Sequence, residues 1–197
     1  EISPIDACNR KCVFCPKSDP INYPNTFKTI ETKLIGKLTE EFRSINYVGT
    51  VIFAGYGEPL LDKKIFEKIK LLSEVCNVEI TTNGDPLNKK VINKLIESGI
   101  GKIIVSLYDG PEQIEKFKKL FEECGVKNDK YILRDRWYKE DEGYGLMLTN
   151  RAGTMDLETK NTPENFSGKC YYPHYSMMID WDGSVYLCPH DWNRKVS

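Results

Sequence analysis

Three cysteines close to the start of the chain carry the strongest chemical signal in the sequence. Cys8, Cys12 and Cys15 stand in the segment DACNRKCVFCP, with the spacing C-x3-C-x2-C and with Phe14 directly before the last cysteine. Thiolates are soft ligands that favour zinc, copper(I) and iron–sulfur clusters. A cluster of four irons has four corners to ligate, so three protein thiolates would leave one iron free to bind a substrate or cofactor. The motif therefore predicts a redox catalyst.

The elements that must position these cysteines follow from apolar runs that alternate with amphipathic segments. Strands are predicted at 50–54, 78–82, 102–107 and 131–133, after a short leading run at 2–6, and helices at 33–44, 62–75, 88–98 and 111–124. Alternation of this kind indicates a parallel sheet of βα units. About five strands and four helices are too few for a closed eight-stranded barrel. We therefore expect an α/β fold, a partial (β/α) TIM-like barrel.

The polar loops of such a sheet meet at one rim. In parallel sheets the chemistry collects at the carboxyl ends of the strands. The cysteine loop and the loops at 55–59, 83–85 and 106–110 all follow predicted strands. We expect these loops to form one site.

The character of the sequence changes near residue 136. The alternating run YSMMIDWDGSVYLC predicts a β-hairpin around Asp182-Gly183. We expect a core domain at 1–136 and a separate small region at 137–197. Because the chain opens at Glu1 without a methionine, we also expect it to be part of a longer protein.

Composition restricts the class of protein and its partners. The chain has 197 residues, 40% of them hydrophobic, which suffices for one substantial domain and an appendage. A net charge of −1 argues against a nucleic-acid partner, and no apolar run is long enough to span a membrane. Seven cysteines without a secretion signal fit metal ligation in a reducing compartment better than disulfides. We therefore expect a cytoplasmic protein.

The motifs together resemble the radical S-adenosylmethionine enzymes. The segment GYGEP at 55–59 is similar to the Gly-Gly-Glu segment of that family, with Tyr56 interrupting the glycines, and TNG at 82–84 follows the next strand. The resemblance covers roughly residues 2–135. It implies that the three cysteines ligate a [4Fe–4S] cluster whose open iron chelates S-adenosylmethionine. It also implies that the reduced cluster cleaves this cofactor to methionine and a 5′-deoxyadenosyl radical, with an electron donor such as flavodoxin or ferredoxin.

Several side chains at the rim are candidates for holding S-adenosylmethionine. Glycines let a backbone approach a ligand closely, and the hydroxyl of Ser106 would meet the ligand's carboxylate. Glu58 would either hold its loop or face the ligand, and Asn83-Gly84 is equally typical of a plain turn. The candidate cofactor-binding residues are Phe14, Tyr56, Gly57, Glu58, Asn83 and Ser106.

The remaining cysteines divide into two groups. Cys76 and Cys124 lie near helix ends among apolar residues, where free cysteine packs as a small hydrophobe. Cys170 and Cys188 flank the predicted hairpin with a spacing similar to the opening of SPASM and twitch domains. That resemblance implies that both ligate a second, auxiliary [4Fe–4S] cluster, whose other ligands would lie beyond Ser197. Two cysteines with another role are the alternative.

A further segment narrows the expected function. LTNRAGTMD at 148–156 resembles the stretch before the auxiliary domain in twitch enzymes of the 2-deoxy-scyllo-inosamine dehydrogenase type. In that resemblance Arg151 reaches the substrate hydroxyl. A guanidinium supplies fixed donors but is a poor proton acceptor, so we assign Arg151 to orientation and electrostatics. A solvated loop arginine is the plain alternative.

The expected function is radical oxidation of a small polar substrate, a sugar or cyclitol alcohol, to a ketone. The electron that is released would pass to the auxiliary cluster. Alternatives are a SPASM-type peptide maturase, a sugar epimerase that uses Cys76 or Cys124 as hydrogen donor, and a non-enzymatic metal-binding module. In the last case His174 or His190 would complete a zinc site.

Overall fold

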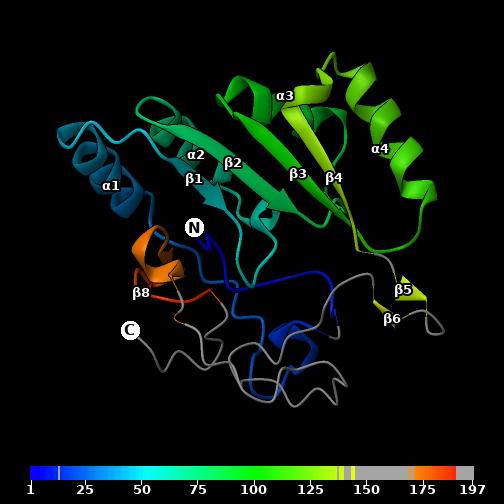
Figure 1. The fold of residues 1–197 in the computed structure, drawn as a ribbon, viewed down its shortest axis with the longest axis horizontal. Helices are drawn as coiled ribbons and strands as arrows, with labels where there is room; N and C mark the ends of the chain where they lie inside the picture. Colours follow the sequence, from blue (N-terminus) through cyan, green and yellow to red (C-terminus); the bar gives the residue numbers. More distant parts are fainter. Residues whose placement is uncertain (13, 137, 140–142, 145–168, 170, 190–197) are drawn as a thin grey trace.

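The computed structural model describes residues 1–12, 14–136, 138–139, 143–144, 169 and 171–189 of the chain (Figure 1). Its centre is a four-stranded parallel sheet with the strand order β1-β2-β3-β4. The strands are β1 (Thr50–Phe53), β2 (Asn77–Thr82), β3 (Lys102–Leu107) and β4 (Tyr131–Asp135). The helices are α1 (Thr32–Ser44), α2 (Ile65–Ser73), α3 (Lys89–Glu97) and α4 (Glu112–Glu123). The alternation of strands and helices that the sequence predicts is confirmed.

The two faces of the sheet differ in chemistry. Alternate strand residues such as Phe53, Ile80 and Val105 are fully buried against the helices and form the core. Successive residues of a strand point to opposite faces, so their neighbours Ile52 and Ile104 face the other side, where they line a cavity. In Figure 1 the helices lie above the strands, and the N-terminal segment (blue) and the hairpin (orange) lie below them. The face of the sheet opposite the helices is therefore the face on which the cysteine loop lies.

The sequence suggests a short fifth strand at 2–6, but the structure has only isolated β-bridges in this run. Ile2 pairs in parallel with Phe53 on one side and with Ile179 on the other. Its backbone N–H donates to the carbonyl of Ile52 over 2.8 Å, and the N–H of Ser3 donates to that of Ile179 over 2.8 Å. Residues 1–3 thus join the edge of the sheet to the C-terminal hairpin.

The predicted hairpin is confirmed and is short. Strands β7 (Met178–Ile179) and β8 (Val185–Tyr186) pair antiparallel around a turn in which Gly183 has a φ of 89°. A second antiparallel pair, β5 (Tyr138–Lys139) and β6 (Gly143–Tyr144), follows the main sheet. The domain boundary near residue 136 stays a prediction.

Two further expectations concern the rest of the described chain. Cys76 and Cys124 pack against the hydrophobic core, as the sequence predicts. None of the helices in the described ranges is both long enough and apolar enough to cross a membrane.

Candidate active site

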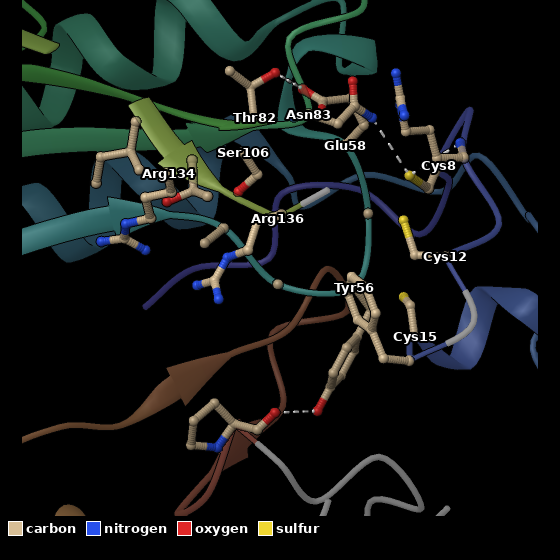
Figure 2. Close-up of a pocket in the computed structure, with 18 of the residues that line it drawn as sticks. Cys8, Cys12, Cys15, Tyr56, Glu58, Thr82, Asn83, Ser106, Arg134 and Arg136 are labelled. Atoms are coloured by element: carbon tan, nitrogen blue, oxygen red, sulfur yellow. Dashed lines mark hydrogen bonds between the residues drawn. The ribbon is translucent and has the colours of Figure 1, made fainter. Parts of the chain in front are cut away.

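A cavity of about 580 Å³ opens at the carboxyl ends of all four parallel strands. The cysteine loop forms one side of it, and the loops that follow β1, β2 and β3 form its floor (Figure 2). The predicted site residues that line it are Cys8, Cys12, Phe14, Cys15, Tyr56, Gly57, Glu58, Asn83 and Ser106. The structure therefore brings these nine residues together, as the expectation of a single rim requires.

The three cysteine side chains share this cavity as half-buried free thiols. The N–H of Cys15 donates to the carbonyl of Cys12 over 2.9 Å, which closes the loop into a turn. The amide of Asn83 lies 3.8 Å from the sulfur of Cys8, within hydrogen-bond range for sulfur. Burial raises the pKa of Cys12 to about 11 and that of Cys15 to about 12. Metal binding must therefore release protons from these thiols.

Arg10 fixes the cysteine loop to two neighbouring loops, a role that sequence reasoning missed. Its guanidinium lies 2.5 Å from Asp85, after β2, and 2.6 Å from Asp109, after β3. The hydrogen bonds to both carboxylates raise the pKa of Arg10, and those from Arg10 lower the pKa of Asp109. The same guanidinium lies 5.3 Å from the ring centre of Tyr108. The sequence shows only that a charged residue lies between two cysteines, and this pattern does not predict which carboxylates it pairs with.

Glu58 holds loops together, one of the two roles left open by the sequence. Its carboxylate accepts from the hydroxyl of Thr82 and the backbone N–H of Asn83, both over 2.7 Å. It also accepts from the N–H of Leu60 over 3.1 Å. Burial raises the pKa of this carboxyl to about 7, although the three hydrogen bonds oppose the rise. Glu58 therefore connects the loop after β1 to the loop after β2.

Gly57 lets the loop after β1 lie directly against the extended segment that leads to the cysteines. A Cβ atom at this position would stand 2.0 Å from the carbonyl oxygen of Ile5 and 2.9 Å from that of Ala7. The next residue, Glu58, uses this close approach to donate its N–H to the carbonyl of Ala7 over 2.8 Å. The glycine is required for contact between backbones.

We expect Gly57→Ala to destabilise the fold by about 1–3 kcal/mol, the usual cost of an overpacked site. Both atoms that the methyl group would meet belong to the backbone, so neither moves away at low cost. The matched control is Gly36→Ala in α1, where a Cβ would meet nothing within 4 Å. That control should stabilise the helix by about 0.5–1 kcal/mol. Thermal unfolding of both variants checks the pair, and equal shifts would contradict the packing argument.

Tyr56 connects the glycine loop to the end of the described chain. Its hydroxyl donates to the carbonyl of Pro189 over 2.8 Å, and Figure 2 marks this hydrogen bond by a dashed line at the Tyr56 side chain. Pro189 follows Cys188, which is half-buried. Cys170 and Arg151 lie outside the described residues, so the auxiliary ligand pair and the role of Arg151 stay predictions.

Two arginines at the end of β4 complete the cavity lining, and sequence reasoning did not select either. Arg134 pairs in register with Ser106 of β3, and Arg136 follows the end of β4. Ser106 itself is 6% exposed and lines the cavity. Charged residues at a strand end usually belong to a solvated face. Alternate residues of a strand point to the same face, so this period of two could have identified Arg134 and Arg136. It places both on the face of the sheet to which Ser106 points.

The residues of this cavity fit the groups that the sequence suggests. The donor set is three thiols on one short loop, the soft ligands that iron–sulfur clusters use. Among the described residues, no group of three histidine, cysteine or acidic side chains is placed so as to hold a single metal ion. The zinc alternative with His174 or His190 stays a prediction, and His190 lies outside the described residues. The volume of the cavity lies in the range typical of organic cofactor sites, about 300–1,000 Å³.

Comparisons with known proteins agree with this arrangement. A curated relative, the "S-adenosyl-L-methionine-dependent 2-deoxy-scyllo-inosamine dehydrogenase" of Niallia circulans, is 29% identical over 100% of this chain and 75% of its own length. A "GTP 3′,8-cyclase" of Clostridium perfringens is 31% identical over 60% of this chain and 36% of its own. The solved structure of BtrN in complex with AdoMet and 2-DOIA superposes with a TM-score of 0.76 at 29% identity. It covers 99% of this chain and 74% of BtrN.

A family model tests the assignment directly. The model described as "Radical SAM superfamily" matches residues 2–130, which hold the three cysteines, strands β1 to β3, helices α1 to α4 and all the loops of the cavity floor. The chain belongs to the radical S-adenosylmethionine superfamily.

Proposed function

We propose that this protein is a radical S-adenosylmethionine dehydrogenase that oxidises an alcohol of a small sugar or cyclitol to a ketone. The observation that carries the proposal is the likeness to BtrN over 99% of the chain, which includes the hairpin as well as the sheet. The curated relative from Niallia circulans is named for a dehydrogenation of this kind.

The cavity residues have distinct parts in holding the cofactors. Cys8, Cys12 and Cys15 would ligate a [4Fe–4S] cluster, and the glycine loop with Asn83 and Ser106 would hold S-adenosylmethionine. When bound and reduced, these cofactors supply a 5′-deoxyadenosyl radical, which can remove a hydrogen atom from a carbon. The protein supplies ligation, orientation and exclusion of water.

The rigid connections around the cavity serve this orientation. Arg10 and Glu58 together tie the cysteine loop and the loops after β1, β2 and β3 to one another. Arrangements of this kind reduce the movement needed when a reacting atom must approach within about 3–3.5 Å of its partner. Arg151 is proposed to donate hydrogen bonds to the substrate oxygen.

An auxiliary [4Fe–4S] cluster is proposed to accept the electron that the oxidation releases, with Cys170 and Cys188 among its ligands. Support comes from the contact of Tyr56 with Pro189, which brings the residue after Cys188 to the glycine loop. We further propose that flavodoxin or ferredoxin reduces the first cluster, and that the protein is cytoplasmic.

The test is anaerobic reconstitution of the full-length protein, followed by reduction with dithionite in the presence of S-adenosylmethionine. We expect about eight irons per chain, four for each cluster, and release of 5′-deoxyadenosine. In a panel of sugars and cyclitols, the substrate should increase 5′-deoxyadenosine and yield an equimolar ketone. Zinc in place of iron, or no cleavage of the cofactor, would exclude the proposal, and cleavage with a substrate but without a ketone would point to the epimerase.

A further inference from the structure

A buried ion pair lies at the base of the cysteine loop. The ammonium of Lys17 lies 2.5 Å from the carboxylate of Asp6, and the two side chains are 4% and 12% exposed. Asp6 stands two residues before Cys8, and Lys17 stands two residues after Cys15. The pair therefore joins the two ends of the segment that carries all three cysteines.

A third segment of the chain is bound to the same pair. The ammonium of Lys17 also donates to the carbonyl of Pro24 over 3.0 Å. The other carboxylate oxygen of Asp6 accepts from the hydroxyl of Thr26 over 2.8 Å. The backbone N–H of Thr26 donates to the carbonyl of Asp6 over 3.0 Å. Both ends of the cysteine loop are thus fixed to the segment at 24–26.

The pair acts on the main cavity through the loop. The lining of that cavity includes neither Asp6 nor Lys17. Both of them line a second cavity, of about 210 Å³. Lys17 lies in the turn η1 (Pro16–Ser18), where the N–H of Ser18 donates to the carbonyl of Cys15 over 2.9 Å. This turn fixes the position of Lys17 relative to Cys15.

The two charges also lie close to the thiols. A lysine is almost never fully buried unless it is paired, and removing one partner of a buried pair leaves an uncompensated charge. Residues two positions apart have Cα atoms within about 7 Å of each other. A charge left alone at Asp6 or at Lys17 would therefore act on whatever the cysteines bind.

We propose that Asp6 and Lys17 are positioning residues for the first cluster, a clamp that holds the cysteine loop closed while its two charges cancel. This role rests on the proposed function, in which Cys8, Cys12 and Cys15 ligate that cluster. Net charge is one of the factors that set the reduction potential of an iron–sulfur cluster. One-electron reduction makes the cluster more negative by one unit, so a nearby positive charge favours the reduced form and a negative charge opposes it. A neutral pair closes the loop without shifting this balance.

The experiment uses the full-length protein, reconstituted anaerobically with iron and sulfide. The variants are Lys17→Met, Asp6→Asn and the double substitution. The first cluster is identified by the change in its electron paramagnetic resonance signal when S-adenosylmethionine is added. Two quantities are measured on that signal: the midpoint potential in a redox titration, and the rate at which EDTA removes the cluster.

The matched control is the buried pair of Asp62 and Lys68. Its two charges are also 2.5 Å apart, and neither residue lines either cavity. The control variants are Lys68→Met, Asp62→Asn and their combination. They break an ion pair of the same kind at a place that is not joined to the cysteine loop.

The two single variants should shift the midpoint potential in opposite directions. Lys17→Met leaves the carboxylate alone and should lower the potential, whereas Asp6→Asn leaves the ammonium alone and should raise it. At an effective dielectric constant of about 20, two unit charges roughly 10 Å apart change an equilibrium constant by more than tenfold. Each shift should therefore exceed about 59 mV, which is tenfold for a one-electron couple.

The double variant separates the clamp from its charges. It should keep the wild-type potential, because no charge is left behind, and it should lose the cluster to EDTA roughly 10-fold faster or more. Loss of a group that orients a metal ligand costs about 10–100-fold in metal affinity. The control variants should be less stable but should keep both the potential and the rate of cluster loss.

Two results would overturn the inference. The first is a pair of single variants whose potentials shift in the same direction or not at all, and the second is a double variant that loses its cluster no faster than the control variants. Both are read against a wild-type protein that holds iron and cleaves S-adenosylmethionine. A wild-type protein that takes up no iron would exclude the proposed function itself, and the clamp with it.

Discussion

Cys12→Ala is expected to abolish cleavage of S-adenosylmethionine and to deprive the first cluster of one of the three protein ligands that we propose for it. Loss of a hydrogen-bond partner that only orients a metal ligand already costs about 10–100-fold in metal affinity or activity, so loss of the ligand itself should exceed that range. Cys12 lines the cavity together with Cys8 and Cys15. Among the described residues, no fourth cysteine lines this cavity and could replace it as a ligand. Iron content and release of 5′-deoxyadenosine after anaerobic reconstitution measure the effect.

Cys76→Ala is the matched control for this substitution. Cys76 is also a free, half-buried thiol, but it packs against the core next to α2, where its sulfur donates to the carbonyl of Leu72 over 3.4 Å. The control should keep its iron and its cleavage activity and lose about 1 kcal/mol of stability, a typical effect of a point substitution. Equal loss of iron in both variants would show that the cysteine loop is not the cluster site.

The second large effect is expected from Lys68→Ala, through the free energy of unfolding. Lys68 is fully buried in α2, and its ammonium lies 2.5 Å from the carboxylate of Asp62, which is 2% exposed. Removing one partner of a buried ion pair leaves an uncompensated charge and costs about 3–5 kcal/mol. The turn η2 (Pro59–Leu61) begins directly after Glu58, and Asp62 follows that turn. The ion pair of Asp62 with Lys68 therefore also anchors the end of the glycine loop to α2. Urea unfolding measures the change.

Two comparisons make this result specific. Lys70→Ala removes an exposed lysine from the same helix and should change stability by no more than about 0.5 kcal/mol. The double variant Asp62→Asn with Lys68→Met leaves no buried charge, so it should be more stable than Lys68→Ala. If the double variant were the less stable one, the cost would come from packing instead of charge.

The fold was predictable from the sequence because its βα units are locally encoded. Buried strands such as KIIVSL at 102–107 and amphipathic helices between them leave a periodic pattern in consecutive residues. The bounds of the helices differ from the expected ones by three residues at most, as at the start of α2, where Ile65 follows the turn made by Asp62. β4 extends two residues beyond the predicted 131–133, and those two residues include Arg134.

The candidate site was predictable only in part, because much of it depends on distant contacts. The cysteine spacing and the glycine loop are legible in consecutive residues. The bonds of Arg10 to Asp109 and of Tyr56 to Pro189 join residues 99 and 133 positions apart. No local pattern encodes such partners. Which of its two roles Glu58 takes follows only from the position of β2 beside β1.

The bridge at Ile2 has a consequence for the order in which the protein is made. Residues 1–3 pair with β1 on one side and with Ile179 on the other, so three of the five hydrogen bonds described for them wait for a segment about 177 positions later. A ribosome adds about 5–20 residues per second, which delays that segment by roughly 10–35 s. The βα units can form during this interval because their contacts are close in sequence. The segment that leads into the cysteine loop is therefore expected to gain its second neighbour last, so during translation the nascent chain would present the cysteine loop before its surroundings are complete.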